Sequence, residues 1–262
     1  PFWWSERGEI VEALWTFHER LPRLVETECS PGSARSVCRE AAKTIREGHV
    51  PGWIPDELIA PIRSASEEYE LSMDLVADQL EAAGVFAGPL RFETEEDLQE
   101  HVERFVVPHA RLIAQVAGVD YGWQRRSITN LARGFFLTAR LAHLPRDLAR
   151  DRLYIPQERL EAADVSIEQL EAGELEEPVS NLLWKEVVRA RDAFAQSLDL
   201  LDDLPWSLRG SFKRAWLGGL EVLHLIEKRD YDVWNEPVRL NRWQRLQIRF
   251  QALAGRAAFN RR

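Results

Sequence analysis

The spacing of apolar residues restricts the fold of this chain more than any other feature of its sequence. Apolar side chains recur every three or four positions, which places them along one side of an α-helix. Two clear examples are Ile10, Leu14, Phe17, Leu21 and Leu98, Val102, Phe105, Val106. The alternation of apolar and polar residues that marks a half-buried strand is hard to find. We therefore expect an all-α protein.

Clusters of Pro and Gly such as Val50-Pro51-Gly52 and Ala87-Gly88-Pro89 interrupt this pattern and mark the ends of helices. None of them resembles a flexible interdomain linker, and a helical chain of 262 residues can bury one continuous core. We therefore expect a single domain over residues 1–262. The expected helices span residues 7–26, 33–47, 55–83, 94–118, 123–150, 178–201, 207–229 and 241–257.

Charge and composition exclude several classes of function. The formal net charge of −9 opposes a general attraction to phosphate backbones, so nucleic acid is not an expected partner. Cys29 and Cys38 have no further ligands at metal-binding spacing, so neither a zinc site nor a disulfide framework is expected. No signal peptide and no apolar run of about 18 residues, the length that spans a bilayer, is recognisable. We expect a cytoplasmic protein, with membrane association left open.

The aromatic stretch Pro1-Phe2-Trp3-Trp4 has two interpretations, docking onto the core or contact with a membrane surface or substrate, and we favour docking. Tryptophans at helical spacing are interpreted in the same way, as packing residues. They are Trp184, Trp206, Trp216, Trp234 and Trp243.

The segment from Leu137 to Pro156, LTARLAHLPRDLARDRLYIP, is the most distinctive part of the sequence. It resembles without gaps a stretch of the squalene/phytoene synthase family that runs roughly LTNxLRDxxEDxxxGRxYLP. Further segments keep the order and spacing of that family, among them RFETEEDL from Arg91 and the late run from Ile226 to Val233. The resemblance covers about residues 13–245. It implies an isoprenoid-synthase-like helical bundle around a central cavity.

The resemblance also implies an activity. Members of this family bind allylic diphosphates through Mg²⁺ ions, which are held by two aspartate-rich motifs on facing helices. Carboxylates at i and i+4 project from one helix face, and hard oxygen ligands suit Mg²⁺, which stabilises the departing diphosphate. The implied reaction is transfer of a prenyl group with release of pyrophosphate.

Both aspartate-rich motifs are depleted here. In the first motif, the expected aspartate positions hold Pro22, Arg23 and Glu26, so one carboxylate remains. In the second motif, His143 and Arg146 stand where the family has an aspartate and a glutamate, and only Asp147 is retained. We expect any remaining Mg²⁺ to be held by Glu26 and Asp147, with metal binding weakened or absent.

A third departure lies between His101 and Ala110, where the family has a tyrosine followed by glycines. Larger side chains and Pro108 imply a narrower or differently shaped cavity. Two hypotheses follow from these departures.

The first hypothesis is a prenyltransferase with an altered acceptor, such as an aromatic compound. Arg20, Arg23, Arg140 and Arg146 would bind the diphosphate, because a guanidinium offers a planar fork of donors. His143 and Asp147 are the candidate catalytic residues, and Trp15 and Tyr154 are the candidate pocket residues.

The second hypothesis is an inactive family member that binds a lipid-like isoprenoid ligand or a protein partner as an assembly factor. For each arginine taken alone, an ordinary ion pair with Glu19, Glu26 or Asp147 is the simpler interpretation. His143 taken alone is more often a satisfied structural histidine than a catalyst. A helical scaffold that acts only through its surface is a third class, and it explains the order of the motifs poorly.

Overall fold

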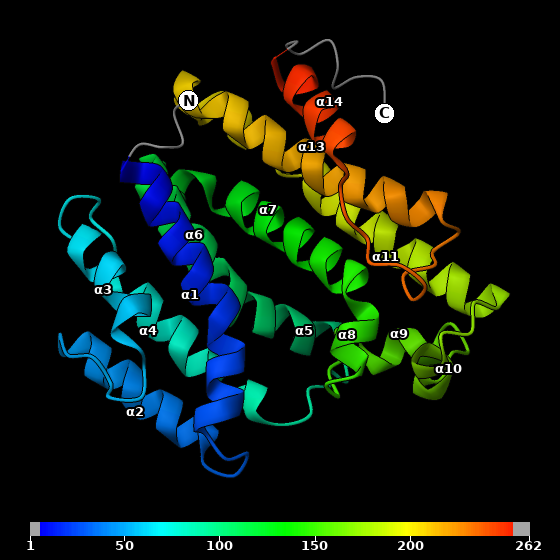
Figure 1. Ribbon diagram of the computed structural model, residues 1–262, viewed down its shortest axis with the longest axis horizontal. Coiled ribbons are helices and arrows are strands. Elements are labelled where there is room, and N and C mark those ends of the chain that lie inside the picture. Colours follow the sequence, from blue (N-terminus) through cyan, green and yellow to red (C-terminus); the bar gives the residue numbers. More distant parts are fainter. Residues whose placement is uncertain (1–5, 254–262) are drawn as a thin grey trace. The chain divides into compact units, whose positions relative to one another are not determined.

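The computed structural model describes residues 6–253, and these residues form helices joined by turns and loops, with no β-strand (Figure 1). The all-α prediction is confirmed. Pro1-Phe2-Trp3-Trp4 and the predicted helix end at residue 257 lie outside the described residues. The chain divides into two compact units, residues 1–129 and 130–262. The expectation of a single domain stays a prediction.

Unit 1 contains helices α1 to α6 and the first turns of α7. Their bounds are α1 Glu6–Glu28, α2 Ala34–Arg46, α3 Asp56–Ala65, α4 Met73–Ala82, the 3₁₀ helix η2 Ala83–Ala87, α5 Glu95–His101, the π-helical segment η3 Val102–Val106, α6 Val107–Ala117 and α7 Tyr121–Ala142. Helix α2 packs against α4, and α1 packs against η2, α3 and α6. Leu14, Phe17 and Leu21 of α1 are buried, as their spacing predicts.

Unit 2 contains the remaining turns of α7 and helices α8 to α14. Their bounds are α8 Leu144–Leu148, α9 Gln157–Glu161, α10 Ile167–Ala172, α11 Glu177–Ala195, α12 Leu200–Asp203, α13 Trp206–Lys228 and α14 Arg242–Leu253. Helix α13 packs against both α11 and α14, and α8 contacts α10.

The fully buried ring of Phe194 from α11 fixes the packing of unit 2. A Cβ atom built on Gly219 of α13 would lie 2.4 Å from Cζ of this ring, and one built on Gly134 of α7 would lie 3.0 Å from its Cδ1. Nε1 of Trp216 donates a hydrogen bond of 2.9 Å to the carbonyl oxygen of Phe194. Glycine on two helices thus allows the Phe194 ring to approach both backbones.

Several predicted helices differ from the observed ones. The helix predicted over 55–83 is interrupted between α3 and α4, where Glu70 has a φ of 50°. The helix predicted over 123–150 ends at Ala142 and resumes as α8 after His143. The short helix α9 was not among the predicted helices. Pro22 lies inside α1, which continues past it.

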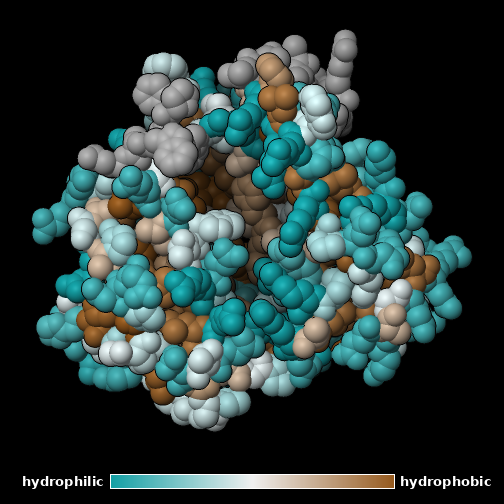
Figure 2. Space-filling model, in the orientation of Figure 1, coloured by the Kyte–Doolittle hydropathy of each residue, from teal (hydrophilic) through white to brown (hydrophobic). Residues whose placement is uncertain are grey.

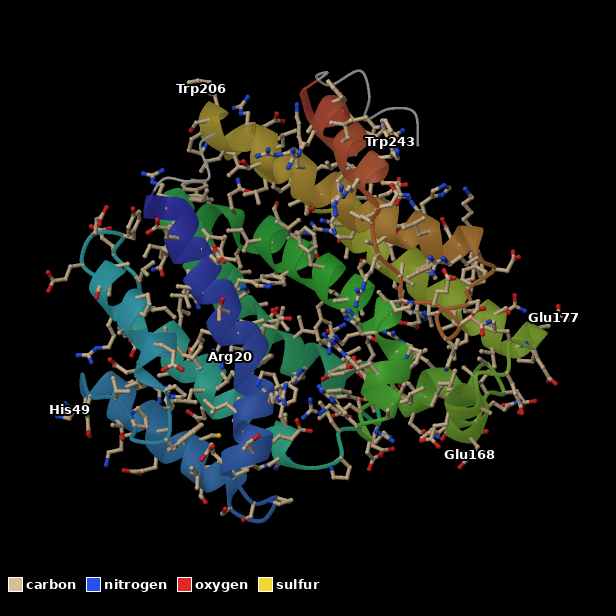
Figure 3. All side chains as sticks on the ribbon, in the orientation of Figure 1. Arg20, His49, Glu168, Glu177, Trp206 and Trp243 are labelled. Atoms are coloured by element: carbon tan, nitrogen blue, oxygen red, sulfur yellow. The ribbon has the colours of Figure 1, made fainter. Side chains whose placement is uncertain are left out.

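The prediction that the tryptophans pack in the core is wrong for three of them. Trp216 is buried, but Trp184 is 48% exposed, Trp206 is 86% exposed and Trp243 is 79% exposed. Figure 3 shows Trp206 at the beginning of α13 and Trp243 on α14. Each stands on a helix face that the described residues leave to solvent, so helical spacing alone did not reveal its environment.

Hydrophilic side chains cover much of the visible face of the molecule, with apolar ones between them (Figure 2). Among residues 6–253, no helix is both long enough and apolar enough to cross a membrane.

Candidate functional site

The junction between α7 and α8 carries the retained carboxylate of the second motif. His143 leaves the helical conformation, with φ of −113° and ψ of 14°, and Pro145 occupies the first turn of α8. The imidazole of His143 is exposed. Partial desolvation, followed by the nearby guanidinium groups of Arg146 and Arg140, lowers its pKa, whereas Asp147 opposes this shift. The imidazole is therefore neutral at pH 7, and it can accept a proton.

Asp147 forms the centre of a cluster with two arginines. Nη1 of Arg140 donates a hydrogen bond of 3.0 Å to Oδ2 of Asp147, and Nη2 of Arg146 lies 3.3 Å from Oδ1. The carboxylate is only 4% exposed, whereas the side chains of Arg140 and Arg146 are 25% and 47% exposed. Two guanidinium groups around one carboxylate leave a net positive charge, and the more exposed Arg146 carries it nearest to solvent.

Tyr154 completes this cluster from the loop after α8. The backbone N–H of Arg152 donates to the carbonyl oxygen of Asp147 at 2.9 Å, which turns the chain back toward α7. The buried Tyr154 ring then lies 4.9 Å from the guanidinium carbon of Arg140 and edge-on to Phe136. Burial raises the pKa of Tyr154, so its hydroxyl stays protonated.

A small pocket lies between these groups, with space for about one water molecule. Two buried carboxylates, from Asp147 and Glu186, face it together with apolar side chains. Its lining consists of Leu137, Arg140, Leu141, Leu144, Asp147, Tyr154, Ile155 and Glu186.

Glu186 was not among the predicted site residues. Its side chain is 3% exposed, and it pairs with Nη1 of Arg159 at 2.6 Å and Nη1 of Arg189 at 2.8 Å. Burial raises the pKa of Glu186, and the neighbouring arginines oppose this shift. The sequence did contain a signal, because Glu186 interrupts an apolar stripe on α11 that includes Leu182 and Ala190. A charged residue within such a stripe requires a buried partner.

A second group of predicted site residues lies on α1 in unit 1. Arg20, Arg23 and Glu26 are exposed, and Trp15 is 54% exposed. Figure 3 labels Arg20 on this helix. Along the sequence of α1, these four residues lie among the residues of the buried stripe, which includes Leu14 and Phe17. The structure therefore brings Arg140, Arg146, Asp147 and Tyr154 together in unit 2, while the residues of the first motif share one helix of unit 1.

An aromatic stack of two histidines lies beside Trp15. The ring of His18 stacks on that of His109 at 4.3 Å between centroids, and Trp15 lies 5.7 Å from His109. Nδ1 of His18 is 2.9 Å from Oε1 of the buried Gln79. Neither ring nitrogen of His109 has a hydrogen-bond partner among residues 6–253. Burial, and then the neighbouring His18, lower the pKa of His109 well below 6.5.

The arrangement of the carboxylates does not fit a magnesium site. Mg²⁺ requires several oxygen ligands in near-octahedral geometry. Both oxygens of Asp147 already accept hydrogen bonds from arginines. Across the part of the chain that the structure describes, no three His, Cys, Asp or Glu residues form a group that could hold a metal ion.

Comparison with known proteins finds the relatives of this chain in one family. The family model described as squalene/phytoene synthase matches residues 10–244. A phytoene synthase from Thermus thermophilus is 26% identical over 181 residues, which cover 69% of this chain. The match spans 62% of that relative's length. A 15-cis-phytoene synthase from Synechococcus elongatus is 22% identical over 249 residues, covering 90% of this chain and 81% of the relative.

Solved structures show the same fold. A dehydrosqualene synthase in complex with a ligand superposes with a TM-score of 0.82 at 16% identity, covering 95% of this chain and 86% of that one. A squalene synthase from Alicyclobacillus acidocaldarius superposes with a TM-score of 0.66 at 18% identity, covering 87% of this chain and 99% of that one.

Proposed function

Because this chain belongs to the squalene/phytoene synthase family, we propose that it binds an allylic prenyl diphosphate and transfers the prenyl group with release of pyrophosphate. The observation that carries this proposal is the cluster in which Arg140 and Arg146 surround Asp147. The resemblance implies that the carboxylate at this position binds Mg²⁺ in other members of the family. Here it holds two guanidinium groups, which bind phosphate oxygens through charge-assisted hydrogen bonds.

The arginines act on the step that breaks the carbon–oxygen bond of the allylic diphosphate. The bonding electrons leave with pyrophosphate, and an allylic cation remains. Arg146, whose side chain is 47% exposed, neutralises the charge that develops on the departing group. Asp147 keeps Arg140 and Arg146 oriented, so little reorganisation is needed during the reaction. That Arg20 and Arg23 of α1 also bind diphosphate stays a prediction from the sequence.

The acceptor that we propose is an aromatic compound. Attack of its ring carbon on the allylic cation forms the new carbon–carbon bond, and loss of a ring proton restores aromaticity. His143 is the proposed base, because its lowered pKa leaves it neutral and able to take this proton. The segment His101–Ala110 supports a changed acceptor, since His101 and His109 are buried in the segment where the family has a tyrosine followed by glycines.

One observation favours a second candidate function. The pocket beside Asp147 admits about one water molecule, and both of its carboxylates are already paired with arginines. A family member that has lost catalysis would keep such a packed cluster for stability and would bind a lipid-like ligand or act as a protein-assembly factor.

Calorimetric titration with farnesyl diphosphate, with Mg²⁺ and then with a chelator, tests the proposal. Binding without metal supports the arginine-based site. Replacing Arg146 with Gln should weaken binding by about tenfold or more, since one charge-assisted contact to phosphate is lost. The control Arg150→Gln changes an exposed arginine after α8 and should stay within about twofold of the unaltered protein.

A pyrophosphate-release assay with an aromatic acceptor then separates the two candidate functions. Asp147→Ala should abolish turnover, because Arg140 and Arg146 lose the group that orients them. Unchanged turnover in this variant would refute the assignment. If the protein neither binds farnesyl diphosphate nor releases pyrophosphate, the inactive family member becomes the better account.

A further inference from the structure

Helix α14 carries apolar side chains on two opposite sides. Ile248 and Ala252 are buried, and Nε2 of Gln244 donates a hydrogen bond of 3.2 Å to Oε1 of Glu221 on α13. This side holds the helix against α13, with which it makes its main contact. Asn241 caps the helix through its Oδ1, which accepts from the backbone N–H of Gln244 at 2.9 Å. These contacts that hold α14 in place therefore all lie on one side of the helix.

The opposite side of α14 exposes large apolar residues. Trp243 is 79% exposed, Leu246 is 40% exposed and Phe250 is 65% exposed. Their spacing of three and four residues places them along one line of the helix. We call these three residues the outer stripe. Folding gains nothing from leaving such side chains in water, so the outer stripe is a candidate contact surface.

Arginines border the outer stripe. Arg242, Arg245 and Arg249 lie on α14, Arg239 precedes it, and all four are exposed. In the sequence, residues 237–262 contain seven arginines and no acidic residue, although the chain as a whole has a net charge of −9. Positive charge is therefore concentrated at this end of an acidic protein, which favours a negatively charged partner.

We propose that the outer stripe of α14 docks on the surface of an anionic lipid bilayer. A helix with Trp, Phe and Leu on one side and arginines beside them lies in the plane of a bilayer interface, with its apolar side chains among the acyl chains and its charges at the headgroups. Tryptophan suits this depth because its ring is apolar and its N–H is polar. The side that holds Gln244 and Ile248 stays on α13.

The exposed apolar side chains of the outer stripe favour a bilayer over other anionic partners. Nucleic acid and soluble polyanions bind mainly through arginine and need no exposed Leu246 or Phe250. A second copy of this chain would meet the same cluster of arginines, and like charges repel. The docking surface does not depend on the proposed reaction, because none of the proposed site residues lies on α14.

Vesicle flotation of the whole protein tests this surface. The protein should float with vesicles in which phosphatidylglycerol replaces about a third of the phosphatidylcholine, and should stay unbound with phosphatidylcholine alone. The double variant Trp243→Ser/Phe250→Ser should reduce binding to the anionic vesicles by at least about tenfold. Arg242→Glu/Arg249→Glu should reduce it by a similar factor, since about a fivefold loss is expected for each removed charge.

Matched controls keep the result specific to α14. Trp184→Ser removes a tryptophan that is 48% exposed on α11, and Arg35→Glu/Arg39→Glu reverses two exposed charges on α2. Both controls should float like the unaltered protein. Circular dichroism verifies that every variant is folded, which is expected because the altered side chains are exposed.

Four outcomes overturn the proposal. The first is no flotation of the unaltered protein with anionic vesicles. The second is flotation that neither pair of α14 substitutions reduces. The third is binding to a short DNA duplex that is as tight as binding to the vesicles and is unchanged by Trp243→Ser/Phe250→Ser, which would make the arginines a general polyanion site. Self-association that depends on Trp243, measured by sedimentation without vesicle binding, would likewise replace the bilayer by a second copy.

Discussion

The guanidinium of Arg140 lies over the ring of Tyr154, with its carbon atom 4.9 Å from the ring centre. The same guanidinium donates to Asp147, so it is held both by a carboxylate and by an aromatic face. A cation on an aromatic face is stabilised by the negative charge density of the ring, and more so when water is excluded. Tyr154 therefore fixes the direction in which Arg140 points.

Replacing Tyr154 with Leu should lower the free energy of unfolding by about 2–4 kcal/mol, because a buried ring and its contact with Arg140 are lost. Tyr154→Phe keeps the ring and should cost about 1 kcal/mol or less. Urea denaturation of the two variants measures the difference. Equal losses would show that the hydroxyl, and not the aromatic face, is what matters.

Replacing Glu186 with Gln should lower the free energy of unfolding by about 3 kcal/mol. Arg159 is 7% exposed and would remain buried without its counter-charge. The control is Glu100→Gln, which breaks an exposed pair with Arg104 at 3.2 Å and should cost less than about 1 kcal/mol. Denaturant unfolding measures the loss in free energy of unfolding for both variants. Similar losses would contradict a role for burial.

Replacing Gly219 with Ala should destabilise the protein by about 1–3 kcal/mol, because the added Cβ would lie 2.4 Å from the rigid ring of Phe194. The neighbouring Gly218 has no atom within 4 Å of such a Cβ, so Gly218→Ala should stabilise α13 by up to about 1 kcal/mol. Opposite shifts in the thermal midpoint are the expected result. A stabilising Gly219→Ala would mean that α11 and α13 can separate at no cost.

Stability should fall as the pH is lowered from about 7.5 to about 5.5, in part because of His109. Burial lowers the pKa of this residue in the folded state, so the unfolded chain, with a pKa of about 6.5, binds more protons in this range. Each proton taken up on unfolding reduces stability, and the loss grows toward the folded-state pKa. Thermal midpoints at the two pH values measure the effect.

His109→Phe keeps a ring in the stack with His18 and removes this titration. The difference between the two midpoints should become smaller in this variant. In the control His49→Asn, which alters an exposed histidine, the difference should remain as in the unaltered protein. If His109→Phe changes nothing, the pH dependence has another origin.

The sequence predicted the helical class and the family correctly, and both are confirmed. It did not predict the break between α3 and α4. That segment has no Gly or Pro to signal a turn, and the turn is fixed by a distant contact in which the backbone N–H of Ser72 donates to Oε1 of Gln115 at 3.1 Å. A contact across 43 positions leaves no local mark on the sequence.

Only part of the candidate site could be predicted from the sequence. Motif register placed Asp147 beside Arg140 and Arg146, because these residues lie within two turns of one another. The pairing of Glu186 with Arg159 joins positions that are 27 residues apart, and only the charge within an apolar stripe pointed to it. The exposure of Trp243 depends on which side of α14 meets α13, and spacing alone cannot decide this.

The π-helical segment η3 makes the number of residues between α5 and α6 structurally important. It joins α5 to α6 without a break, and a π-helical turn holds about one residue more than an α-helical turn. Because the extra residue is contained within that turn, deleting one residue between Val102 and Val106 would restore an α-helical turn and leave the side chains of α6 close to their present directions. Deleting one residue from the α-helical turns of α5 would instead rotate the side chains on either side of the deletion by about 100° relative to each other. Segment η3 is therefore the place along this helix where the chain can lose a residue and keep its buried side.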